Sequence, residues 1–170
     1  MSDLAFLVLR VVAGGLFIGH GAQKLFGWFG GRGIDGTASS MAALGLRPAT
    51  AWALLAGMSE LGGGLLTLLG LLNPLGPVAV IASMMMAIAT VHWGKPVWAS
   101  QGGAELPMTN IAVAVALILA GPGRYSLDWA LQRPLPEWTA LPALAIVIAV
   151  IALGLASRVA PRAAAAGSAG

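Results

Sequence analysis

Apolar residues fall into five long runs along this chain, separated by short segments rich in proline, glycine and polar residues. Within each run the apolar residues are continuous rather than alternating, which favours helices over the strands of a membrane β-barrel. A helix of about 20 residues spans roughly 30 Å, the thickness of a bilayer's hydrocarbon core. The pattern therefore predicts an all-α integral membrane helical bundle whose five helices cover residues 4–26, 50–72, 75–93, 104–120 and 138–156.

The segments between the runs support these limits. Pro48 stands where the second helix begins, and residues 73–77 form a very short connection with two prolines. The second and third helices are therefore expected to be antiparallel neighbours. The connection at residues 27–49 is longer, and we expect its larger apolar side chains to lie flat at the membrane interface: Trp28, Phe29, Met41 and Leu44.

Composition agrees with a membrane protein, because 58% of the residues are hydrophobic and only 9% are charged, against about 25% charged in globular proteins. This leaves no room for a soluble catalytic domain. The chain has no cysteine, so it forms no disulfide or thiolate metal site, and a redox role requires a bound group. The basic residues behind the net charge of +3 are scattered, which argues against a nucleic-acid partner.

Loop charge predicts the orientation in the membrane, since Lys and Arg are enriched on the cytoplasmic side. Arg124 and Arg133 fall on one side, while Arg10 lies near the same end within the first helix. The first helix lacks a basic segment before it and a clear cleavage site, so we expect it to be retained. We expect the N-terminus outside and the C-terminus in the cytoplasm, with these residues on the cytoplasmic side: Lys24, Arg32, Arg47, Lys95, Arg158 and Arg162.

Six of the polar or ionisable residues inside the predicted helices are candidates for a site, because such residues are costly there unless they face a bundle interior, a cavity or the head groups. With antiparallel helices, Lys24, His92 and Asn110 should lie near one level. His20 should lie one turn deeper, and Glu60 about 15 Å inside the second helix. The six candidates are Arg10, His20, Lys24, Glu60, His92 and Asn110.

One stripe of the first helix, about 80° wide, holds Arg10, Gly14, Phe17, Gly21 and Lys24, with a histidine at its edge. We expect this stripe to face inward. The carboxylate of the second helix is then the expected partner of Arg10 or Lys24, because a buried charge needs a counter-charge.

Glycine is abundant, and two small-x-x-x-small patterns, Gly15 with Gly19 and Ser59 with Gly63, are expected to allow close helix approach. Packing is the commoner role of glycines in membrane helices.

Each polar candidate also has a structural explanation. Lys24 is typical of a cation that extends to the interface, Arg10 of either such a cation or an ion-pair partner, and His92 beside Trp93 of an interfacial anchor. Two histidines and Glu60 are a known metal ligand set, yet no compact metal motif is present, so no metal site is predicted.

Four segments in register resemble the DoxX family: residues 9–31, residues 57–70, His92, and residues 109–128. The resemblance implies a small four-helix protein of the bacterial plasma or inner membrane. Relatives named DoxD are associated with thiosulfate:quinone oxidoreductase. The positions that match the family's motifs are Arg10, His20, Gly21, Lys24, Glu60, His92, Asn110, Gly121, Gly123 and Asp128.

The predicted organisation is a DoxX-like four-helix membrane domain at residues 4–128 and a linker at residues 129–137. A fifth transmembrane helix at residues 138–157 is an addition to the family pattern. Residues 158–170, rich in alanine, glycine and serine, are expected to be a disordered tail.

Two hypotheses for function follow. In the first, the chain is a subunit of a quinone-linked oxidoreductase with a redox partner protein, Glu60 with His20 or His92 forms a catalytic proton relay, and Arg10, Lys24 and Asn110 bind the ligand. In the second, it is a non-enzymatic membrane scaffold or a carrier for a lipophilic small molecule. The fifth helix is also placed to contact a second copy in a homo-oligomer.

Overall fold

The computed structural model describes residues 2–158, and within them it contains helices and no strand. Four helices in this part of the chain are long and apolar enough to cross a membrane, at Asp3–Phe26, Ala49–Leu69, Leu75–His92 and Glu137–Ala156. They correspond to α1 (Ser2–Phe26), α3 (Ala49–Leu69), α4 (Leu75–Ala87) extended by a π-helical turn, and α7 (Ala140–Ala156) with the turn before it. The predicted all-α membrane bundle is confirmed.

The remaining apolar helix, α5 (Glu105–Ala120), is shorter than the other four. At 16 residues it spans only about 24 Å. A further short helix, α6 (Leu127–Leu131), follows it. The predicted tail falls outside the described residues except for Arg158, and so does Arg162 of the predicted cytoplasmic set.

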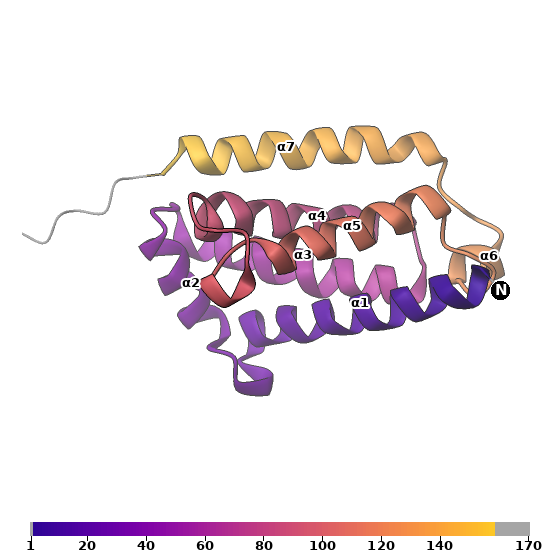
Figure 1. Ribbon diagram of the computed structural model, residues 1–170, viewed down its shortest axis with the longest axis horizontal. Coiled ribbons are helices and arrows are strands. Elements are labelled where there is room, and N and C mark those ends of the chain that lie inside the picture. The colour runs from indigo at the N-terminus through magenta and orange to yellow at the C-terminus, as the bar shows by residue number, and fades with distance from the viewer. Residues whose placement is uncertain (1, 159–170) are drawn as a thin grey trace, which may run out of the picture.

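The membrane helices pack in sequence order, α1 against α3, α3 against α4, and α4 against α5, while α7 packs against α4. Figure 1 shows α7 along one edge of the bundle and α1 along the opposite edge. The predicted antiparallel pairing of the helices that flank residues 73–77 is confirmed. We call the end that holds the N-terminus and α6 the Asp128 end, and the end that holds α2 (Gly33–Ala43) the Lys24 end.

The predicted inward stripe of α1 is buried. Arg10 and Phe17 are each 2% exposed, and Gly14 and Gly21 are also buried, whereas Lys24 is half-buried. Polar and small residues thus share the face that α1 turns toward α3, as the helical spacing indicated.

Glycines of that stripe set how closely α1 and α3 approach. A Cβ added to Gly14 would lie 2.7 Å from the carbonyl oxygen of Gly64, and one added to Gly21 would overlap the backbone of α3. Added at Gly15 or Gly19, a Cβ would meet nothing within 4 Å. The expected contact at Gly15 and Gly19 is therefore wrong, because the stripe that contains Arg10 turns this pair outward.

The long first connection contains α2, which the sequence pattern did not predict as a helix. The Thr37 hydroxyl of α2 donates hydrogen bonds to the carbonyls of Lys24 at 2.9 Å and Gly33 at 2.8 Å, which fixes α2 against the end of α1. Trp28 and Phe29 are exposed, as expected for interfacial side chains. Met41 and Leu44 are instead half-buried and face the bundle.

Candidate functional site

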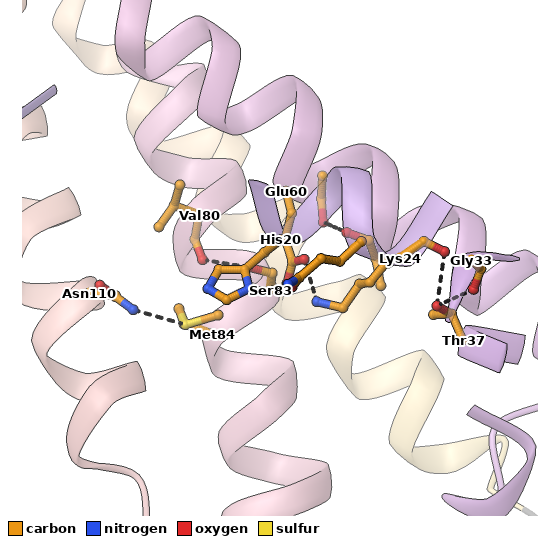
Figure 2. A network of polar contacts seen from close by, with 12 residues as sticks. His20, Lys24, Gly33, Thr37, Glu60, Val80, Ser83, Met84 and Asn110 are labelled. Carbon is orange, nitrogen blue, oxygen red and sulfur yellow. Dashed lines mark hydrogen bonds and ion pairs between the residues drawn. The ribbon is translucent and has the colours of Figure 1, made fainter. Parts of the chain in front are cut away.

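The predicted partner of Glu60 is present. Glu60 is 3% exposed on α3, and the Nζ of Lys24, from the last turn of α1, donates to its Oε2. Figure 2 shows the two side chains meeting between the two helices. Gly21 lies against Leu61, the residue after Glu60, and Lys24 follows Gly21 by about one turn of α1. The flexible lysine side chain can therefore reach the carboxylate.

Arg10 does not pair with Glu60, contrary to one of the two expected pairings. It is buried at the Asp128 end, where its Nη2 donates to the carbonyl of Tyr125 at 2.7 Å. Helix α1 carries both cations, with Arg10 four turns before Lys24, so the two lie at different levels of the bundle. A Cβ added to Gly70 would overlap the Arg10 guanidinium, so glycine is needed there.

Asp128 lies near Arg10 with the opposite charge, although the two side chains do not form an ion pair within 4 Å. Its carboxylate accepts hydrogen bonds from the backbone amides of Leu72 at 2.9 Å and Asn73 at 2.8 Å, and only 1% of the residue is exposed. The cluster of Arg10 and Asp128 thus ties the α3–α4 connection to the segment that leads into α6. Every oxygen of Asp128 has a backbone partner, which indicates an architectural role.

The remaining sequence candidates have other partners. His20 is exposed and hydrogen-bonds through Nδ1 with Oε1 of Gln23 at 3.2 Å. His92 hydrogen-bonds through Nδ1 with the carbonyl of Gly102 at 2.7 Å, in the connection before α5.

The Asn110 amide of α5 points to the sulfur of Met84, 3.7 Å away, and Figure 2 shows both near the level of Glu60. Within residues 2–158, neither histidine nor Asn110 contacts Lys24 or Glu60 through a hydrogen bond or ion pair. Their proposed catalytic and binding roles stay predictions.

A cleft of about 400 Å³ lies between α3, α4 and α7, and Lys24 and Glu60 form part of its wall. Most of its lining is aliphatic, with hydroxyl groups from Ser59, Ser83 and Thr90. Ser59 and Ser83 donate to backbone carbonyls of their own helices, at 3.0 and 3.1 Å. An apolar cavity with a few convergent polar groups is the usual form of a small-molecule site.

A larger hollow, of about 740 Å³, lies at the Asp128 end. Its lining includes the exposed side chains of Arg124, Trp129 and Gln132, with the Arg124 guanidinium 5.6 Å from the Trp129 ring centre. Asp128 also lines it, with both carboxylate oxygens held by backbone amides, and neither Lys24 nor Glu60 does. We therefore place the candidate site in the smaller cleft, where the buried ion pair faces an apolar space.

Sequence reasoning found the ion pair but missed the cleft. The contribution of α7, through Ile146, Val147, Val150 and Ile151, depends on where that helix packs. One available signal was the cluster of small residues on α3 and α4, which leaves space between helices. No group of three histidine, aspartate or glutamate residues that could hold a metal occurs among the described residues.

Comparison with known proteins bears on this arrangement. The sequence model of the DoxX family matches residues 5–93, just over half of the chain, and this range contains Lys24, Glu60 and both histidines. A protein of Bacillus subtilis (strain 168) named "Putative oxidoreductase CatD" is 29% identical over 126 residues, covering 74% of this chain and 86% of that protein. No solved structure gives a significant match.

Proposed function

This chain belongs to the DoxX family of multi-pass membrane proteins, and we propose that it is the membrane subunit of a quinone-linked oxidoreductase. The observation that carries the proposal is the apolar cleft with Lys24 and Glu60 in its wall. The name of the Bacillus subtilis relative supports an oxidoreductase role. The proposed location is the plasma or inner membrane of a bacterium.

The chemistry of the wall suits a quinone head group. Aliphatic lining accommodates a lipophilic ring, while the Lys24 ammonium is a donor for a ring carbonyl and the Glu60 carboxylate is an acceptor for a hydroxyl. When bound, a quinone supplies reversible two-electron, two-proton chemistry. The chain has no cysteine, and in this proposal the electrons come from a partner redox protein.

Glu60 is the residue proposed to hold and transfer a proton at its carboxylate oxygen. Its burial makes the lone charge costly, and Lys24 balances that charge in the absence of ligand. Lys24 is about a third exposed, so its ammonium is free to turn toward a ligand while remaining solvated. His20 is the proposed next group of the relay, since it lies one turn from Lys24 on α1.

A second candidate function is that of a non-enzymatic carrier for a lipophilic molecule. It is favoured by the mostly aliphatic lining and by the fact that Lys24 and Glu60 satisfy each other. A carrier binds the oxidised and reduced forms of a quinone without changing their ratio when a redox partner is added.

The test compares Glu60→Gln with Glu137→Gln, a matched change at an exposed carboxylate before α7. We expect Glu60→Gln to fold and to bind a decyl-tailed benzoquinone roughly tenfold more weakly, a loss of about 1.4 kcal/mol. Glu60→Ala should lose more. Binding to the purified full chain and quinone content after mild detergent extraction are the measurements.

The opposite result would contradict the relay. If Glu60→Gln lowers the melting temperature in detergent but leaves quinone binding and redox coupling undiminished, the carboxylate is only a packing partner. Unchanged quinone redox state in membranes that contain a reductant and the partner fraction, with intact binding, favours the carrier.

A further inference from the structure

We propose that the cleft holds a single hydrocarbon chain, and that this chain enters sideways from the bilayer between α3 and α7. The inference rests on the proposed binding role of the cleft and is independent of the redox role. It assigns to the site a second part, a chain subsite along α4 and α7, beside the polar groups at Lys24 and Glu60.

The cleft is long and narrow. Its lining follows α4 and the π-helical turn after it from Leu75 to Val91, a length of about 24 Å at the α-helical rise. A volume of about 400 Å³ spread over that length gives a mean cross-section of roughly 17 Å². Carbon atoms pack at about 4 Å, so a hydrocarbon chain has a cross-section of roughly 15 to 20 Å².

The width is not uniform along the cleft. Small side chains gather near the level of Glu60, whereas larger ones line the two ends, among them Leu75 and Met86. The space is therefore greatest beside the ion pair, where a ring or another polar group fits, and narrow elsewhere. The small lining residues near this level are Ala56, Ser59, Ala79, Ala82 and Ser83, and Ala87 lies further along α4.

The Lys24 end of the cleft is narrowed by contacts of α7 with α3 and α4. Leu46 is fully buried there, and α7 lies so close that a Cβ on Gly154 would be 2.7 Å from the Trp52 ring and 2.9 Å from Met86. Arg158 secures the same end of α7, with its Nε donating to the carbonyl of Leu44 at 3.1 Å. These contacts narrow this end of the cleft, where Lys24 and Val91 in its wall stay partly exposed.

The side between α3 and α7 is open. Leu55 of α3 is 47% exposed and Ile146 of α7 is 64% exposed, although both line the cleft, whereas Val78 on its floor is 4% exposed. Both helices are long and apolar enough to span the membrane, so this opening faces lipid. Because α7 packs against α4, the edge of α7 that faces away from α4 forms one side of this opening, which we call the mouth of the cleft.

The test measures how much a chain adds to binding. In nanodiscs, the full-length protein is titrated with a decyl-tailed benzoquinone and with the same ring bearing a methyl group. We expect the tail to improve affinity at least roughly tenfold in the wild type. Ile146→Trp, which fills the mouth, should remove most of that gain, so that the two compounds bind this variant with similar affinity.

Ile148→Trp is the matched control, because Ile148 is 58% exposed on α7 but does not line the cleft. It should retain the full gain, and it corrects for partitioning of the tail into lipid. An equal gain in Ile146→Trp and Ile148→Trp overturns the chain subsite, yet methyl-ring binding that depends on Glu60 still supports the proposed function.

A second measurement covers the case in which Ile146→Trp does not fold. A fatty acid with a diazirine at its chain end is photolysed with the wild-type protein, and the labelled peptides are identified. Labels on α4 and α7 support the chain subsite, even where neither benzoquinone binds and the proposed function fails. Labels confined to α1 and α5 overturn it.

Discussion

The two buried ionic clusters differ in what surrounds them. Arg10 and Glu60 are almost equally buried, at 2% and 3% exposure. The carboxylate of Asp128 near Arg10 accepts hydrogen bonds from two backbone amides, whereas the Glu60 carboxylate is paired with the Lys24 side chain. Burial cost alone therefore does not separate a site from a structural bond, because both clusters incur it. Nor does access to an empty volume, because Asp128 lines the larger hollow as Glu60 lines the cleft. The two carboxylates differ in how they are held: backbone amides fix both oxygens of Asp128, whereas the partner of Glu60 is the flexible side chain of Lys24.

The largest effect is expected at the Asp128 end. Asp128→Ala leaves the amides of Leu72 and Asn73 without acceptors and Arg10 without its counter-charge. We expect a loss of about 3 to 5 kcal/mol in the free energy of unfolding, measured by thermal unfolding in detergent. If Asp128→Ala is as stable as the wild type, the contrast between an architectural and a functional cluster fails.

The next effect tests how the close approach of α1 and α3 supports the Lys24 end. Gly21→Leu places a side chain where α3 already lies, so we expect a loss of roughly 1 to 3 kcal/mol and weaker quinone binding. Gly19→Leu is the control, since the space beyond Gly19 is open. Equal melting temperatures for both variants would show that the interface is not set by Gly21.

A smaller effect on the core is expected when residues 134–170 are deleted. Lys24 and Glu60 lie on α1 and α3, so their pairing does not depend on α7. The truncated protein should remain folded and membrane-inserted but lose the tail-dependent gain in quinone affinity. Membrane fractionation and the nanodisc titration check this, and degradation of the truncated chain despite normal expression counts against a separable α7.

The smallest effect on stability is expected for His20→Ala. His20 is exposed, and its hydrogen bond within residues 2–158 is with the Gln23 side chain. We expect a change within about 0.5 kcal/mol, together with slower quinone-linked turnover if His20 follows Glu60 in the relay. Unchanged turnover at unchanged stability removes His20 from the site and restricts the proposed function to Lys24 and Glu60.

Helical periodicity was enough to predict the membrane helices, the inward stripe of α1 and the Lys24–Glu60 pair, because each depends on spacing within one helix and on antiparallel neighbours. The partner of Arg10 was not predictable in this way. Tyr125 and Asp128 reach it only because the chain turns back after α5. The cleft was missed for a similar reason, since helix spacing does not determine which groove α7 occupies.

Gly154 allows the C-terminal end of α7 to lie close to both α3 and α4. Helix α7 packs along α4. At its C-terminal end, Gly154 lies close to Trp52 and Met86, and Arg158 donates a hydrogen bond to the carbonyl of Leu44. The Lys24–Glu60 pair joins α1 and α3 and involves no residue of α7. A displacement of α7 away from α3 is therefore expected to widen the lipid-facing side of the cleft without breaking the Lys24–Glu60 pair.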